Sequence, residues 1–205
     1  MLIIAHRVNT IEGLKAVPHH YGVEIDIRGV YEDMFLHHDP LKAGVQYDNL
    51  VDYLAAYEHT FVIFNTKEMG YEQRIIDLAA KHGVEDYFLL DEEFPYIYRA
   101  TRKEGVRKIA VRYSETEPIE MCEAQVVDGK TLFDWVWIDT NTTLPLNADV
   151  ITRFKQLGVK TALVCPERWG RPDDIAAYQA QMDGLGFKPD AVMTSMKCAP
   201  LWEAW

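Results

Sequence analysis

The chain has 205 residues, enough for one domain or two small ones with a sizeable core. Hydrophobic residues make up 48% and charged residues 26%, which are ordinary values for a globular protein. The formal net charge of -11 argues against nucleic acid as a partner, because a binder of the phosphate backbone needs a basic face. Small anionic substrates stay compatible with this charge, since a bound cation can reverse the local sign.

The N-terminus and the cysteines indicate a cellular location. The opening "MLIIAHRVNT" has no charged region before its short apolar run, and no apolar stretch approaches the ~20 residues of a membrane helix. Cys122, Cys165 and Cys198 match neither a zinc spacing nor a disulfide framework, so they are predicted to be small buried hydrophobic residues. We therefore expect a cytoplasmic protein without membrane insertion.

Short apolar and β-branched runs recur along the chain and alternate with segments of helical spacing. The predicted strands cover residues 2–5, 23–27, 61–64, 87–90, 109–113, 135–139, 161–165 and 191–194. Predicted helices lie between several of them, at 47–58, 71–83, 94–105, 147–158 and 171–186. Asn147 and Asp173 are the expected N-terminal signals of the last two helices, and the segment 113–134 is the least regular.

This alternation predicts an α/β fold with a parallel sheet. Eight strands are the number that closes a barrel, so the favoured fold is a small TIM (β/α)8-type barrel in which residues 1–205 form a single domain. A doubly wound open sheet would show the same alternation and is the alternative fold.

The second predicted strand carries two acids, Glu24 and Asp26, in "VEIDI". A spacing of two places both carboxylates on one face of the strand. Inside a barrel they would be desolvated and would repel each other unless a cation lay between them, and oxygen ligands of this kind suit Mg²⁺ or Ca²⁺. The alternative is that they form the exposed polar face of an edge strand.

Other ionisable residues also follow strand-like runs, where a barrel gathers its reactive groups. His6 and His38 can supply a base and an acid near neutral pH. Arg7 and Lys67 can clamp an anionic group, and Arg112 is a further candidate for substrate or phosphate binding. Histidines, cations and a divalent metal together favour phosphoryl chemistry.

Four stretches, "IIAHRVNT", "VEIDIRGVYEDMFLHHDP", "VIFNTK" and "PDAVMTSMKCAP", together resemble the glycerophosphodiester phosphodiesterase family. The resemblance covers both ends of the chain in the correct order, whereas between about 90 and 185 only the strand–helix rhythm agrees. It implies metal-dependent hydrolysis of a small glycerol- or polyol-phosphodiester, in some cases through a cyclic phosphate. A divalent cation, Mg²⁺ or Ca²⁺, is the cofactor that it implies.

The resemblance also assigns roles to individual residues. His6 and His38 look like the acid/base pair, Glu24 and Asp26 like two of three metal-binding carboxylates, and Arg7 and Lys67 like phosphate contacts. The chain departs from the family in other positions. The third acid is replaced by Asn65, a glycine is replaced by Val8, and an aspartate near the end is replaced by Ser195. Asn65 can bind a metal through its carbonyl but removes one negative charge, which Asp91 or Asp139 could restore.

Two other functions stay open. One is a barrel that has lost turnover with its third carboxylate and only binds a phosphorylated ligand. A sugar-phosphate isomerase or an aldolase with Lys67 as nucleophile is a weaker alternative.

The remaining aromatic residues and the C-terminus also carry predictions. Trp135 and Trp137 are predicted in the core, whereas Trp169 and Glu167 are candidate pocket residues. The terminal "CAPLWEAW" either caps the barrel or docks on a second copy in a homo-oligomer.

Overall fold

The computed structural model describes residues 1–205, and their contacts divide the chain into two compact units. The N-terminal unit contains Ile4–Glu93. The C-terminal unit contains Phe94–Trp205 together with Met1–Ile3.

No helix is both long enough and apolar enough to span a membrane. The three cysteines are buried and unpaired by disulfides, which confirms their predicted character.

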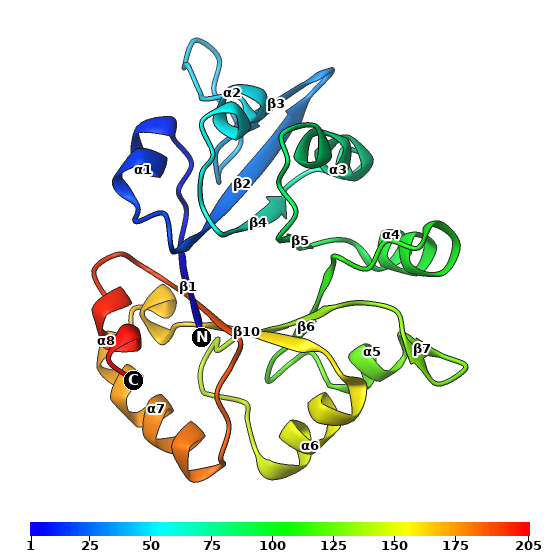
Figure 1. Ribbon diagram of the computed structural model, residues 1–205, viewed down its shortest axis with the longest axis vertical. Helices are drawn as coiled ribbons and strands as arrows, with labels where there is room; N and C mark the ends of the chain where they lie inside the picture. The colour runs from blue at the N-terminus through cyan, green and yellow to red at the C-terminus, as the bar shows by residue number, and fades with distance from the viewer. The chain divides into compact units, whose positions relative to one another are not determined.

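The N-terminal unit is a parallel sheet with strand order β5-β4-β2-β1, and a hairpin extends its longest strand (Figure 1). In the hairpin β3 pairs antiparallel with the end of β2. The elements are β1 (Leu2–Ala5), α1 (Ile11–Ala16), β2 (Gly22–Val30), β3 (Asp33–Leu36), α2 (Leu50–Ala55), β4 (Phe61–Thr66), α3 (Glu72–Lys81) and β5 (Tyr87–Leu90).

Burial explains why these strands read as unbroken apolar runs. Residues 22–27 of β2 and 61–66 of β4 are buried on both faces, as expected of a parallel sheet that is covered on each side. The side chain of Thr10 caps α1 and that of Asn49 caps α2, each accepting a hydrogen bond from a backbone N–H of the first turn. The strand ends are thereby held at fixed positions for the polar residues that follow them.

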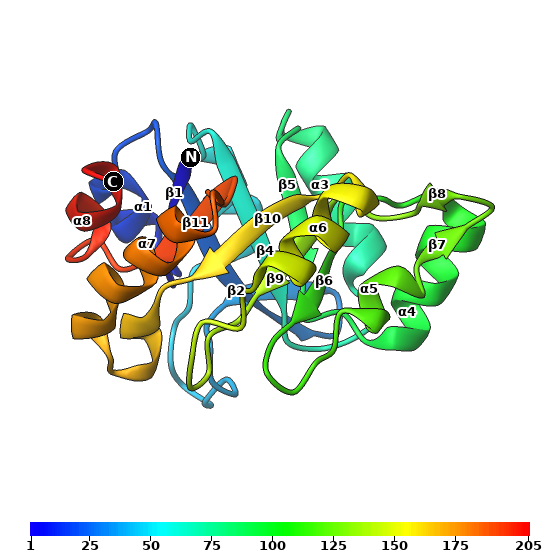
Figure 2. The ribbon, with the colours of Figure 1, turned by 90° about the horizontal axis from the view of Figure 1, so that it is seen from below.

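The C-terminal unit has strand order β11-β10-β9-β6, also parallel. The hairpin of β7 and β8 lies beside α5 (Figure 2). The elements are α4 (Phe94–Arg99), η1 (Ala100–Glu104), β6 (Ala110–Tyr113), α5 (Glu120–Glu123), β7 (Val126–Val127), β8 (Lys130–Thr131), β9 (Trp135–Ile138), α6 (Ala148–Leu157), β10 (Lys160–Val164), η2 (Pro166–Trp169), η3 (Pro172–Asp174), α7 (Ile175–Gly184), β11 (Ala191–Thr194) and α8 (Ala199–Glu203).

The helix signals were right at α6 and wrong at α7. Asn147 caps α6 by accepting from the N–H of Val150, and the helix stops at Gly158 in the left-handed region. Asp173, the expected signal for α7, lies inside the short 3₁₀ helix η3 instead. Pro172 begins that 3₁₀ turn, so α7 starts only at Ile175 and Asp174 occupies the N-cap position.

Eight parallel strands therefore alternate with helical segments, with β3 and the β7–β8 hairpin as additions. This is the α/β class of the (β/α)8 barrel, as the sequence predicts. Trp135 and Trp137 are buried, which confirms their predicted place in the core. That residues 1–205 behave as one domain stays a prediction.

Candidate active site at the strand ends of the N-terminal unit

Glu24 and Asp26 lie in the middle of the sheet of the N-terminal unit. Their strand, β2, is flanked by β1 and β4, and the two residues are 1% and 0% exposed. This excludes the alternative of an exposed polar face on an edge strand. In the register of β2 and β4, Asp26 is directly opposite Asn65, so their side chains emerge side by side.

The carboxylate of Glu24 is held by donors from two neighbouring strand ends. Its Oε2 accepts a hydrogen bond of 2.8 Å from the backbone N–H of Arg7, and its Oε1 accepts one of 2.9 Å from Nδ2 of Asn65. His6 Nε2 lies 4.0 Å from Oε2. Burial, and secondly the negative charge of Asp26, raises the pKa of Glu24 to about 7.

Asp26 is held by one amide and one ammonium. Asn9 donates to Oδ2 over 2.8 Å and accepts from the Asp26 N–H over 2.8 Å, forming a two-point contact. The other oxygen, Oδ1, accepts no aligned hydrogen bond and lies 3.0 Å from Nζ of Lys67. Asn9 was not among the residues predicted to belong to the site. Its position shortly after the first strand, in "VNT", is the sequence feature that could have identified it.

Lys67 lies where three oxygen-bearing side chains meet. Besides Asp26, its Nζ donates to Oδ1 of Asn65 over 2.7 Å and is 3.7 Å from Oδ2 of Asp91. The Lys67 side chain is only 14% exposed. Lys67 is thus part of the carboxylate cluster. We define the carboxylate cluster as Glu24, Asp26, Asn65, Lys67 and Asp91.

One residue of the carboxylate cluster and one residue that contacts it have a left-handed backbone, which is unfavourable for residues other than glycine. Arg7 has a φ of 56° just after β1, and Asp91 has a φ of 63° just after β5. This conformation lets the Arg7 N–H face Glu24 and brings the Asp91 carboxylate to Lys67. Strained backbone of this kind gathers at functional sites, because the surrounding contacts must compensate for its cost.

A second group of polar residues follows β3. Nδ1 of His38 donates to Oδ1 of Asp39 over 2.7 Å, because an ionised carboxylate only accepts. This hydrogen bond, with smaller contributions from the charges of His38, His37 and Arg7, holds the pKa of Asp39 below its usual value. Arg28 fixes the segment by donating to the backbone oxygen of His38. Arg7 is exposed.

The expected metal ligands, Glu24, Asp26 and Asn65, do not fit one shared divalent cation as they are arranged. Asn65 donates its N–H to Glu24 and accepts from Lys67 through its oxygen. The reversed amide would place its oxygen against the Glu24 carboxylate and its N–H against the Lys67 ammonium, and neither pair can form a hydrogen bond. The cation beside Asp26 Oδ1 is the Lys67 ammonium. No three His, Cys, Asp or Glu side chains are placed to share a metal ion.

Arg112 lies in the C-terminal unit and is held by two acids. Its guanidinium donates to Glu117 over 2.8 Å and to Asp139 over 2.7 Å. The other oxygen of Asp139 accepts from Trp169 Nε1 over 3.1 Å. Within the N-terminal unit the structure brings together His6, Arg7, Glu24, Asp26, Asn65 and Lys67. A role of Arg112 in substrate binding stays a prediction.

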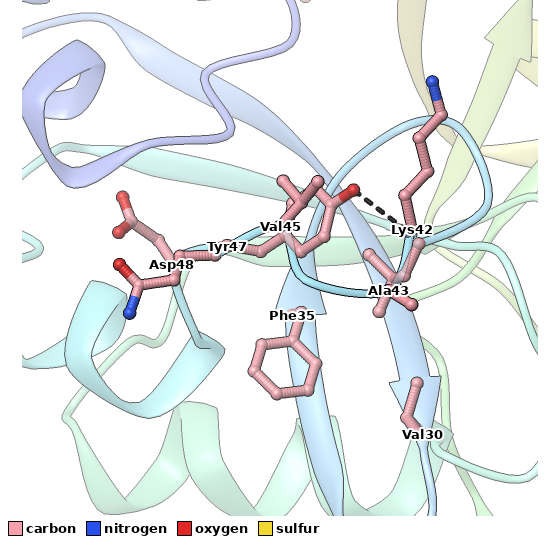
Figure 3. A pocket seen from close by; sticks show the side chains of 9 residues that line it. Val30, Phe35, Lys42, Ala43, Val45, Tyr47 and Asp48 are labelled. Atoms are coloured by element: carbon pink, nitrogen blue, oxygen red, sulfur yellow. Dashed lines mark hydrogen bonds between the residues drawn. The ribbon is translucent and has the colours of Figure 1, made fainter.

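A cavity of about 690 Å³ lies in the N-terminal unit and contains none of the predicted site residues (Figure 3). Phe35 and Val30 come from the β2–β3 hairpin, and the loop of residues 41–48 supplies the other walls. Tyr47 accepts a hydrogen bond from the Lys42 N–H, and its ring packs edge-on against His37. Because neither of the candidate histidines nor the carboxylate cluster lines it, we do not place the reaction in this cavity.

Comparisons with known proteins give matches in structure but not in sequence. No family model matches the chain, and no curated protein matches it. A glycerophosphoryl diester phosphodiesterase from Parabacteroides distasonis superposes with a TM-score of 0.64 at 15% identity, over 94% of this chain and 81% of that one. A glycerophosphodiester phosphodiesterase from Agrobacterium tumefaciens superposes with a TM-score of 0.61 at 12% identity, over 95% and 96%. The chain therefore has the α/β TIM-barrel-type fold of these two phosphodiesterases.

Proposed function

We propose that the protein hydrolyses a small phosphodiester whose alcohol groups are glycerol or another polyol. One observation carries the proposal: His6, Arg7 and Lys67 gather around the buried pair Glu24 and Asp26, at the strand ends of a fold that two glycerophosphodiester phosphodiesterases share. The clustered residues are also those on which the sequence resembles that family. Strand ends are where barrels of this type carry their chemistry.

The exposed Arg7 guanidinium suits the phosphate, because its planar fork can bind two phosphate oxygens at once. Arg7 lies near enough to Asp39 for its charge to act on that carboxyl, so Arg7 and the His38–Asp39 pair belong to one region. A phosphate bound there would have both a cation and an imidazole beside it. This combination neutralises charge and moves protons in the same step.

The two histidines supply the proton transfers of the proposed reaction. One imidazole takes the proton of the attacking hydroxyl, from water or from a neighbouring substrate group, and the other gives a proton to the leaving alkoxide. Asp39 fixes the tautomer of His38 so that Nε2 faces the reaction. His6 is 17% exposed and lies beside Glu24, so it is anchored from the interior.

The test is hydrolysis of a panel of glycerophosphodiesters by the purified protein and by His38→Ala, with Mg²⁺, Ca²⁺ or Mn²⁺ and with a chelator. We expect turnover in the wild type and a loss of about 100-fold or more in the variant, the usual contribution of an acid/base group. His19→Ala is the matched control, because His19 is exposed and its contacts, with the exposed Glu58 and the ring of His59, lie outside the candidate site. Equal turnover in His38→Ala and the wild type would refute the role of His38.

A binding barrel without turnover is the second candidate, and Asn65 is the observation that favours it. An amide stands where the resembling family has an acid, which lowers the negative charge of the carboxylate cluster. This candidate predicts that a phosphodiester binds in calorimetry while none of the panel is cleaved. Arg7→Ala would then weaken binding, because the phosphate contact is lost.

The aldolase alternative is disfavoured by the contacts of Lys67. A Schiff base requires a neutral amine, whereas Nζ here donates to Asn65 and lies 3.0 Å from the Asp26 carboxylate. Borohydride trapping with a carbonyl substrate is expected to leave Lys67 unmodified.

A further inference from the structure

The carboxylate cluster contains its own fixed cation. Nζ of Lys67 is within 3.0 Å of Asp26 Oδ1 and 2.7 Å of Asn65 Oδ1, with Asp91 Oδ2 at 3.7 Å. These oxygens come from β2, β4 and the residue after β5, so three neighbouring strand ends converge on one ammonium. Oxygens converging on one point from several strands are the arrangement that a hard cation requires.

Asn65, the amide at the position of the family's third acid, forms hydrogen bonds to the Lys67 ammonium and to Glu24 that an acid could not both form. An acid at position 65 would have no N–H to donate to Glu24 and would place a third negative charge beside two buried ones. Asn65 instead donates to Glu24 on one side and accepts from Lys67 on the other. One amide thus links the carboxylate of Glu24 to the ammonium, and it removes the charge that a divalent ion would balance.

The buried acids also have their hydrogen-bonding needs met by the chain itself. Glu24 receives two N–H donors and Asp26 Oδ2 receives one from Asn9. The single oxygen without an aligned donor, Asp26 Oδ1, is the one that faces the ammonium. A buried carboxylate without a cation would be costly, so Lys67 meets a requirement that a metal would otherwise meet.

We propose that the Lys67 ammonium takes the place of a divalent cation, so that the protein binds its phosphodiester without Mg²⁺ or Ca²⁺. The inference concerns the site of the proposed function and deepens it. The Lys67 side chain is held at its tip and is 14% exposed, so its position is set before any ligand arrives. A cation delivered by the chain is present at any metal concentration.

The experiment is calorimetric titration of Mg²⁺, Ca²⁺ and Mn²⁺ into the chelator-treated full chain, with thermal unfolding measured beside it. For the wild type we expect no saturable binding at about 1 mM, the weak end of protein calcium sites, and no shift in melting temperature. One-to-one binding tighter than this, lost in Asp26→Asn, would overturn the proposal. This titration needs no substrate, so its result is independent of whether the protein cleaves phosphodiesters.

The variant Lys67→Met tests the role of the lysine itself. Removing the ammonium leaves Asp26 Oδ1 without a cation, so we expect a lower melting temperature that added divalent metal raises, together with at least tenfold tighter metal binding. Lys81→Met is the matched control, because Lys81 is exposed in α3 and should change neither property. A folded Lys67→Met that gains no metal binding would overturn the role assigned to Lys67. If Lys67→Met does not fold, the wild-type titration decides alone.

Discussion

At the scale of single residues, the N-terminal unit holds several acids away from water. Glu24 and Asp26 are buried in β2, Glu72 is 4% exposed at the start of α3, and Glu92 follows β5. Each has a hydrogen-bond donor nearby: the Arg7 N–H for Glu24, Asn9 for Asp26, the Gly70 N–H for Glu72 and the Thr66 hydroxyl for Glu92. The carboxylate cluster also contains Lys67, whose ammonium lies 3.0 Å from the buried carboxylate of Asp26. This is why we place the chemistry there and not at Glu92.

Glu92 should make the stability of the protein depend on pH. Burial, together with the charges of Glu72 and Asp91, raises its pKa from 4.5 to about 8 against the opposing hydrogen bond from Thr66. Between these two values the folded state keeps a proton that the unfolded state has lost. Stability from Glu92 is therefore fully present below pH 4.5 and falls as pH rises towards 8, by at most about 1.4 kcal/mol per pH unit.

The check is urea unfolding at several pH values for the wild type, Glu92→Gln and the exposed neighbour Glu93→Gln. Glu92→Gln keeps the shape of the side chain and cannot ionise, so the fall in stability between pH 5 and 8 should become shallower. Glu93→Gln should follow the wild type. Identical pH profiles for Glu92→Gln and the wild type would show that Glu92 is ionised normally.

At the scale of elements, the last helix is part of the C-terminal unit and not a loose tail. In α8 Trp202 is 1% exposed, and its Nε1 lies 3.1 Å from Sγ of Cys165. The ribbon of α8 lies beside α7 (Figures 1 and 2). Trp205 donates to Asp183 at the end of α7, and Gln179 of α7 donates to the Leu201 carbonyl. The terminal aromatic residues are thus used within the chain. Association with a second copy stays a prediction.

Trp202→Ala should destabilise the protein by about 3–5 kcal/mol, the usual cost of emptying a large core position. Leu201→Ala, the control on the same helix, should cost little because Leu201 is 53% exposed. Chemical unfolding of both variants measures the difference. Equal small effects would mean that α8 does not pack as described.

At the scale of the whole molecule, the prediction of a single domain can be tested with the natural tryptophans. All five lie between residues 135 and 205, so tryptophan fluorescence reports only on the C-terminal unit. A single domain unfolds in one cooperative transition in which every probe agrees. A change made only in the N-terminal unit must then move the fluorescence transition as well.

Leu54→Ala in α2 is such a change, because Leu54 is 2% exposed and its truncation should cost about 2–5 kcal/mol. We expect its tryptophan and far-UV circular dichroism transitions to shift together to lower urea concentration. Val51→Ala on the same helix is the control, since Val51 is 43% exposed. An unchanged tryptophan transition in Leu54→Ala would show that the two units unfold independently.

The local features were predictable because they depend on near neighbours in the chain. Alternation of apolar runs with helical spacing predicts all eight parallel strands to within two residues at most ends, although β2 extends three residues further, to Val30. Glu24 and Asp26 share a face because strand geometry has a period of two. The β7–β8 hairpin was not predicted, since its strands are two residues each, too short to show periodicity.

The sequence predicts which residues of the candidate site lie close together, whereas only the tertiary structure shows how their charges and hydrogen bonds are arranged. Sequence spacing brings Glu24, Asp26, Asn65 and Lys67 to neighbouring strand ends, and it predicts a metal among them. Which cation lies there depends on side-chain rotamers, on the orientation of one amide and on the left-handed backbone of Asp91, and these are set by contacts between residues up to 41 positions apart. No local pattern encodes such contacts, because each is the joint result of strand register and packing.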